Sequence, residues 1–126
     1  MSLRILYAED DADIQAIARF ALEELGGFTI RTCQSGRAAL AEAPDFRPDL
    51  VLLDVMMPEM DGPATLAALR ALPGMETVPV AFMTAKAQTH EMARYRALGI
   101  AAVITKPFDP MTLADQVRAI HAGQGG

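Results

Sequence analysis

The chain has 126 residues, 52% of them apolar and 21% charged, and its 11 basic and 16 acidic side chains give a formal net charge of −5. These values are typical of one globular domain, exclude a disordered or low-complexity chain and argue against a surface for nucleic acids or anionic membranes. The one cysteine, Cys33, excludes an internal disulfide, and no apolar run has the length of a membrane helix. We therefore expect one cytoplasmic domain over residues 1–126, in which residues 123–126 form a flexible tail.

Two hydrophobic periodicities alternate along the chain and predict strands and helices in turn. In chain order they predict strand 3–8, a helix with its apolar face from Ile14 to Leu25, strand 28–33, a short helix capped by Ser35 that ends near Pro44, strand 49–54, a helix between Gly62 and Pro73, strand 78–83, helix 87–98, strand 101–105, and a last helix opened by Asp109 and Pro110. Segment 28–33 alternates as half-buried or edge strands do, whereas 49–54 is apolar up to its final acid, as central strands are. This pattern predicts an α/β fold with a single doubly wound, five-stranded parallel sheet.

Polar and charged side chains mark the carboxyl ends of four of the five predicted strands. Glu9 and Asp10 follow the first strand, Asp54 ends the third, Thr84 follows the fourth and Lys106 follows the fifth. Ligands of open parallel sheets bind at this edge. If the four marked strands are neighbours, three acids, a hydroxyl and an amine share one crevice.

Such a crevice suits a divalent cation and a phosphoryl group. Carboxylates at about 4 Å repel by roughly 1 to 4 kcal/mol per pair, and Mg²⁺ relieves that repulsion while keeping positions for phosphate oxygens. A carboxylate such as Asp54 can itself be the nucleophile and form an aspartyl phosphate. The metal, Lys106 and Thr84 would then stabilise the transferring oxygens.

Four motifs, in this order and spacing, resemble the receiver domain of bacterial two-component response regulators: ILYAEDD (5–11), LLDVMMPEMDG (52–62), MTA (83–85) and KPF (106–108). The resemblance covers roughly residues 3–122. It implies a CheY-like, flavodoxin-like (βα)5 fold with strand order 2-1-3-4-5, and a cis peptide bond between Lys106 and Pro107.

The resemblance also implies a role for each marked residue. Asp54 is the phosphoacceptor, and it receives its phosphoryl group from a sensor histidine kinase or a histidine phosphotransfer protein. Thr84 and Lys106 bind the phosphoryl oxygens. The implied ligands of Mg²⁺, for which Mn²⁺ is the alternative ion, are Asp10, Asp54, the backbone carbonyl of Met56, and Glu9.

The implied activity is that of a signalling phosphoacceptor, which assists its own phosphorylation and dephosphorylation, rather than that of an enzyme with a separate substrate. The implied partners are the kinase and a downstream protein that the sequence does not name, with no nucleic acid or membrane bound by this domain. The expected state is a monomer or a phosphorylation-dependent dimer. Met56 and Lys86 occupy positions that tune the lifetime of the phosphoryl group in the family.

One position departs from the family pattern and keeps a second interpretation open. Val103 stands where the family usually has Tyr or Phe, whose ring moves on phosphorylation. This departure favours a pseudo-receiver, an interaction module that works without phosphorylation, although the acids and the lysine that pseudo-receivers usually lose are present. A phosphohydrolase is disfavoured, because residues 55–57 offer no second acid. Asp11 is expected to be a helix N-cap rather than a metal ligand.

Overall fold

The computed structural model describes residues 2–85 and 88–123, and the elements within these ranges alternate as the sequence predicts. The strands are β1 (Arg4–Ala8), β2 (Thr29–Cys33), β3 (Leu50–Asp54), β4 (Val80–Thr84) and β5 (Ala102–Thr105). The helices are α1 (Ala12–Phe20), the π-helical turn η1 (Ala21–Leu25), α2 (Gly36–Phe46), α3 (Gly62–Arg70), α4 (Thr89–Ala97) and α5 (Leu113–His121).

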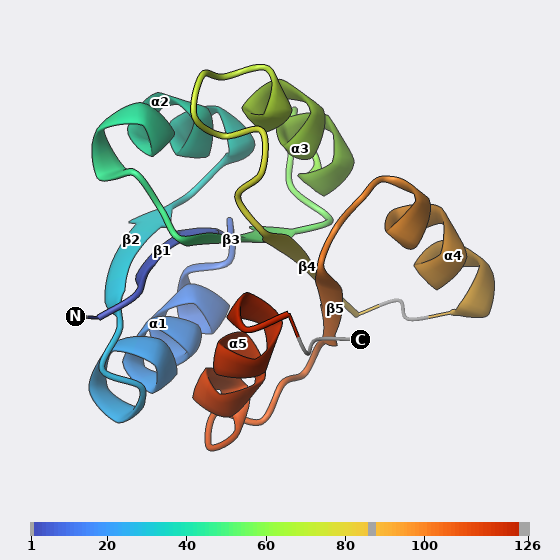
Figure 1. Ribbon diagram of the computed structural model, residues 1–126. Helices are drawn as coiled ribbons and strands as arrows, with labels where there is room; N and C mark the ends of the chain where they lie inside the picture. The colour runs from blue at the N-terminus through green and yellow to red at the C-terminus, as the bar shows by residue number, and fades with distance from the viewer. Residues whose placement is uncertain (1, 86–87, 124–126) are drawn as a thin grey trace.

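The five strands form one parallel sheet in the order β2-β1-β3-β4-β5, which confirms the predicted topology and the edge position of β2. The sheet lies between two layers of helices, with α1 and α5 on one face and α2 and α3 on the other (Figure 1). Helix α4 lies beyond β4 and β5 and packs with the layer of α2 and α3 through Tyr95.

The alternation of side chains along each strand divides the core into two halves. Ile5 and Tyr7 of β1 pack into the half that α1 and α5 cover, whereas Leu6 and Ala8 pack into the half that α2 and α3 cover. All four side chains are fully buried. Burial of one large aliphatic side chain contributes about 1.5–3 kcal/mol to the free energy of folding. The buried side chains of the central strands therefore hold the carboxyl ends of these strands in place.

Helix α2 contains a proline close to its end. Ser35 caps its first turn, as expected, by accepting a hydrogen bond from the amide of Ala38. The helix passes through Pro44 and ends two residues later, at Phe46, near the expected end. A proline this close to the end of a helix removes one backbone hydrogen bond, and burial of Phe46, which is 3% exposed, compensates for that loss.

Helix α5 begins later than predicted. Asp109 and Pro110 do not open it; the side chain and carbonyl of Asp109 instead accept hydrogen bonds from the amides of Met111, Thr112 and Leu113. These bonds form a turn that precedes the helix, which starts at Leu113. The Asp-Pro signal therefore marks the turn and not the first helical residue.

Among the residues that the structure describes, no helix is both long and apolar enough to cross a membrane. The flexible tail expected over 123–126 lies outside the described residues except for Gly123, and Lys86 lies outside them as well.

Candidate functional site

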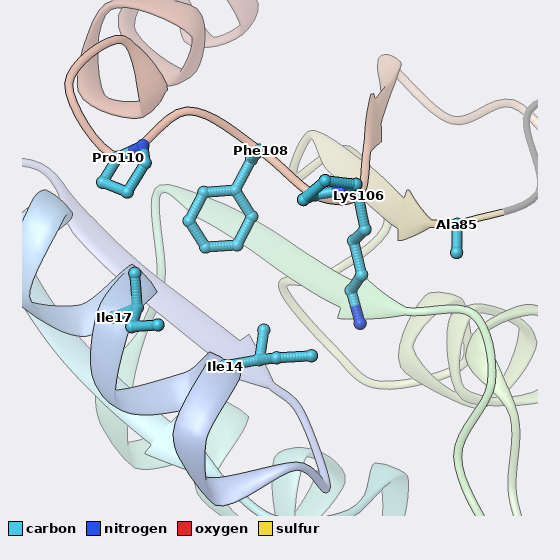
Figure 2. Close-up of a pocket in the computed structure, with 7 residues that line it drawn as sticks. Ile14, Ile17, Ala85, Lys106, Phe108 and Pro110 are labelled. Carbon is cyan, nitrogen blue, oxygen red and sulfur yellow. The ribbon is translucent and has the colours of Figure 1, made fainter.

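The carboxyl edge of the sheet brings together the marked side chains of the four neighbouring strands. The register pairs Ala8 with Leu53, so the residues that follow, Glu9 and Asp54, stand beside each other. Thr84 ends β4 on the other side of Asp54 and is 1% exposed. Lys106 extends from the end of β5 toward the end of β3 (Figure 2).

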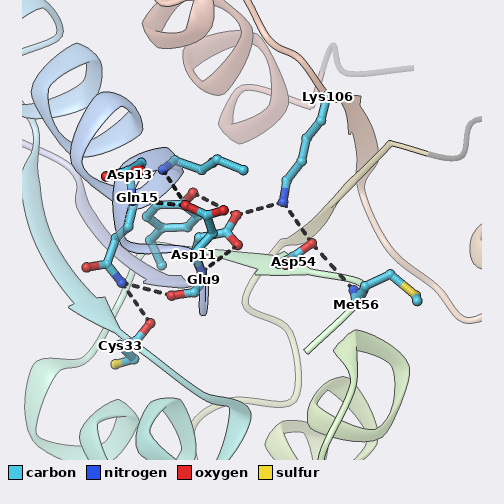
Figure 3. A network of polar contacts seen from close by, with 10 residues as sticks. Glu9, Asp11, Asp13, Gln15, Cys33, Asp54, Met56 and Lys106 are labelled. Carbon is cyan, nitrogen blue, oxygen red and sulfur yellow. Dashed lines mark hydrogen bonds and ion pairs between the residues drawn. The ribbon is translucent and has the colours of Figure 1, made fainter. Parts of the chain in front are cut away.

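Lys106 joins the two buried acids. Its Nζ atom lies 2.7 Å from Oε1 of Glu9 and 3.0 Å from Oδ1 of Asp54 (Figure 3). The Glu9 side chain is 1% exposed and that of Asp54 is 6% exposed, so both contacts are shielded from water. Because a buried charge is costly without a partner, the single amine is the counter-charge that allows both acids to lie here.

The carboxylate of Glu9 receives further hydrogen bonds from its own segment of chain. Tyr7 Oη donates to Oε1 at 3.3 Å, and the backbone N–H of Asp11 donates to Oε2 at 3.2 Å. Both oxygens of Glu9 therefore have donors, and the orientation of the carboxylate is restricted. The predicted role of Asp11 is confirmed, since its side chain caps α1 by accepting hydrogen bonds from the amides of Asp13 and Ile14.

Burial and neighbouring charges shift the protonation equilibria of the site. Burial raises the pKa of Asp54 to about 6; the hydrogen bond from Lys106 opposes that rise, and the nearby Glu9 adds to it. Burial by itself lowers the pKa of Lys106, but the hydrogen bonds and charges of Glu9 and Asp54 outweigh it and raise that pKa above its ordinary value. Burial, and then Glu9, raise the pKa of Tyr7, so its hydroxyl remains protonated and can donate.

Glu9, Asp10 and Asp54 form the cluster that could hold a metal ion. One carboxylate oxygen from each lies within 4.8 Å of the others. Asp10 is exposed while Glu9 and Asp54 are buried, so the cluster opens to solvent on one side. Three oxygen donors beside open positions match the preference of Mg²⁺ for carboxylates, retained water and phosphate oxygens. The donor set therefore fits the ion that the sequence predicts.

The loop after β3 lies against the carboxyl end of that strand. The amide of Met56 donates to Oδ1 of Asp54 at 3.4 Å, and the Met56 side chain is 64% exposed. Gly62 donates its N–H to the carbonyl of Val55, and a Cβ at Gly62 would lie 3.0 Å from the carbonyl oxygen of Asp54. A larger residue there would be in tight contact with the backbone of Asp54 and Val55, which would have to shift slightly to make room.

An apolar cavity of about 470 Å³ lies beside Lys106, between α1 and the segment that follows β5. The peptide bond between Lys106 and Pro107 in that segment is cis, as expected. The residues that line the cavity are Ile14, Ile17, Ala85, Lys106, Pro107, Phe108 and Pro110 (Figure 2). The side chain of Lys106 therefore borders both the acidic cluster and this apolar cavity.

Two participants were missed by the sequence analysis. Tyr7 has the two-residue spacing that places it on the same face of the strand as Glu9, and that spacing was the available signal. Gln15 Nε2 donates to the backbone carbonyls of Glu9 and Cys33 and so ties the end of β1 to the edge strand β2. Nothing in the helical pattern around Gln15 indicates this contact. Cys33 is a buried strand residue, and His90 and His121 are exposed.

The five-stranded parallel sheet and the acidic cluster at its carboxyl edge are typical of receiver domains, and the comparisons with known proteins agree. The family model described as the response regulator receiver domain matches residues 5–118. The chain belongs to this family of signalling phosphoacceptors in two-component systems.

Individual relatives share the domain at moderate identity. Over 96% of its length, the chain is 34% identical to the transcriptional regulatory protein CseB of Streptomyces coelicolor, and over 94% it is 38% identical to the DNA-binding response regulator MtrA of Mycolicibacterium paratuberculosis. It covers 52% and 51% of those two proteins, so it spans about half the length of these curated relatives. The chemotaxis protein CheY4 of Vibrio cholerae superposes with a TM-score of 0.89 at 27% identity, covering 95% of this chain and 99% of that one.

Proposed function

We propose that the chain accepts a phosphoryl group on Asp54 from the phosphohistidine of a sensor histidine kinase or histidine phosphotransfer protein. The observation that carries this proposal is the contact of one amine, Lys106 Nζ, with both Glu9 and Asp54 at the carboxyl edge of the sheet. This arrangement concentrates a nucleophilic carboxylate, a cation and further acids where parallel sheets bind ligands.

In the transfer, a carboxylate oxygen of Asp54 forms a bond to phosphorus as the bond between phosphorus and the donor imidazole nitrogen breaks. The electron pair of the broken bond stays with the imidazole. Asp54 must be ionised to attack, and a pKa of about 6 leaves it mostly ionised at pH 7 and above.

The other residues of the site stabilise the transferring oxygens. The raised pKa of Lys106 keeps its amine charged, so it can turn from Asp54 to a phosphoryl oxygen. The hydroxyl of Thr84, the last residue of β4, would donate a hydrogen bond to another phosphoryl oxygen. Glu9, Asp10, Asp54 and the carbonyl of Met56 would hold Mg²⁺, which when bound neutralises charge on the phosphoryl oxygens and the carboxylates.

The consequence of phosphorylation is a change in binding to a downstream protein, by a monomer or a phosphorylation-dependent dimer. MtrA, a relative, is named as a DNA-binding response regulator. This chain has a formal net charge of −5, so we assign no nucleic-acid contact to it.

A second function, an interaction module that works without phosphorylation, is favoured by Val103 alone. This half-buried side chain packs beside the buried residues of the α2 and α3 layer and offers no aromatic ring to move.

Intact-protein mass spectrometry after treatment with acetyl phosphate or phosphoramidate and Mg²⁺ tests the proposal. We expect a single phosphoryl increment on the wild type that is absent from Asp54→Asn and from samples with EDTA. The matched control is Asp45→Asn, which changes an exposed acid of α2 and should be phosphorylated like the wild type. A folded wild type that gains no increment supports the interaction module instead.

A further inference from the structure

A tyrosine occupies the interior of β1 where the neighbouring side chains are aliphatic. Ile5, Leu6 and Ala8 are fully buried beside it, and Tyr7 itself is 0% exposed. An aliphatic side chain would suit this environment without a polar atom, whereas a buried tyrosine hydroxyl needs a hydrogen-bond partner. The partner is Oε1 of Glu9, at 3.3 Å.

The carboxylate of Glu9 accepts hydrogen bonds from three donors, one of which, the Lys106 amine, also contacts Asp54. The Lys106 amine contacts both Glu9 and Asp54, and in the proposed transfer it turns to a phosphoryl oxygen. The hydroxyl of Tyr7 and the N–H of Asp11 belong to the same segment as Glu9 and have no such second task in the proposed chemistry. When Lys106 moves, these two donors continue to fix the carboxylate.

We propose that Tyr7 is a positioning residue for the divalent cation: its hydroxyl holds Glu9 in the orientation that places a carboxylate oxygen within 4.8 Å of those of Asp10 and Asp54. The inference rests on the proposed function for the identity of the cation. Hydrogen-bonding partners of metal ligands orient the ligand, and their removal typically weakens metal binding by about 10- to 100-fold. Tyr7 is one of three donors and its bond is long, so the effect here lies near or below the lower end of that range.

The test compares Tyr7→Phe with the wild type by calorimetric titration with Mg²⁺. The substitution keeps the ring and removes the hydroxyl. We expect the Kd for Mg²⁺ to rise by about 3- to 10-fold. The matched control is Tyr95→Phe, which removes the hydroxyl of another buried tyrosine, on α4, and should leave the Kd within about twofold of the wild type.

A second measurement separates positioning from a purely structural role. In Tyr7→Phe the Mg²⁺ concentration that gives half of the maximum phosphorylation rate should rise in parallel with the Kd, while the maximum rate at saturating Mg²⁺ stays within about twofold of the wild type. If the hydroxyl serves only as a hydrogen-bonded group of the core, its removal would change the melting temperature and leave the Kd for Mg²⁺ unaltered.

An unchanged or lower Kd in Tyr7→Phe overturns the inference, and so does a wild type that binds no Mg²⁺. A wild type that binds Mg²⁺ but accepts no phosphoryl group overturns the proposed function, and the Kd of Tyr7→Phe still decides the role of Tyr7.

Discussion

The ring of Tyr95 on α4 stands edge-on to the ring of Phe82 on β4, with centroids 5.3 Å apart and an interplanar angle of 85°. Within Thr89–Ala97, all of which the structure describes, Tyr95 is the one buried side chain. The helix therefore depends on this aromatic pair for its attachment to the sheet. Phe82 is two residues before Thr84 on the same strand, so the two side chains lie on the same face of the sheet.

Replacement of this anchor should destabilise the domain and release α4. We expect Tyr95→Ala to lower the free energy of unfolding by about 2–4 kcal/mol, because a buried aromatic ring and its edge-on contact are lost. Hydrogen exchange of the α4 amides should accelerate more than that of β1 or β3. Tyr95→Phe keeps the ring and should lose less than about 1.5 kcal/mol; equal losses in the two variants would contradict the anchoring role.

The raised pKa of Asp54 predicts a characteristic dependence of stability on pH. The pKa rises from 3.8 to about 6 on folding, so the folded state holds the proton more tightly than the unfolded state. Ionisation of Asp54 therefore costs stability, and the cost grows as the pH rises from about 4 to 6 and reaches about 3 kcal/mol above that.

Asp54→Asn removes this cost. In the absence of metal, we expect the variant to be more stable than the wild type by about 1–3 kcal/mol at pH 8 and nearly equal to it at pH 4. Denaturant unfolding followed by circular dichroism at several pH values measures the difference. A difference that does not vary with pH would show that the buried carboxylate is not the cause.

Binding of Mg²⁺ to the acidic cluster should stabilise the folded chain. At a concentration ten times the Kd, we expect a gain of about 1.4 kcal/mol, reversed by EDTA. Asp10→Asn should weaken this gain, because Asp10 is one of the three clustered acids. Asp13→Asn changes an exposed acid in the first turn of α1 outside the cluster and should respond to Mg²⁺ like the wild type. Equal responses of the two variants would argue against a role for Asp10.

The end of α2 offers a test of backbone strain remote from the chemistry. Arg47 follows the helix with φ of 52°, a left-handed conformation that glycine adopts without steric cost. Arg47→Gly should therefore raise the free energy of unfolding by about 0.5–1 kcal/mol. Arg19→Gly, the same replacement inside α1, should lower it by about 1 kcal/mol. Thermal or denaturant unfolding measures both changes, and their opposite signs would show that Arg47 is strained by its left-handed backbone conformation.

The sequence was sufficient for the elements, the strand order by resemblance, and the grouping of Glu9, Asp10, Asp54, Thr84 and Lys106 at one edge, because parallel strands that end in polar residues place them together. It was insufficient where a single contact decides the outcome. Continuation of α2 past Pro44 depends on a burial site for Phe46 that only the packed helices create. The hydroxyl of Tyr7 is indistinguishable from core packing until the orientation of Glu9 is known.

The contact between Glu9 and Lys106 joins residues separated by 97 positions in the chain. During synthesis Glu9 and Asp54 therefore leave the ribosome well before the amine that neutralises them. A nascent chain that ends before β5 holds two acids at the edge of an unfinished sheet with no lysine from that strand, and their mutual repulsion opposes docking of β1 against β3. The cluster of Glu9, Asp54 and Lys106 is thus completed by one of the last segments to be made, the turn that follows β5.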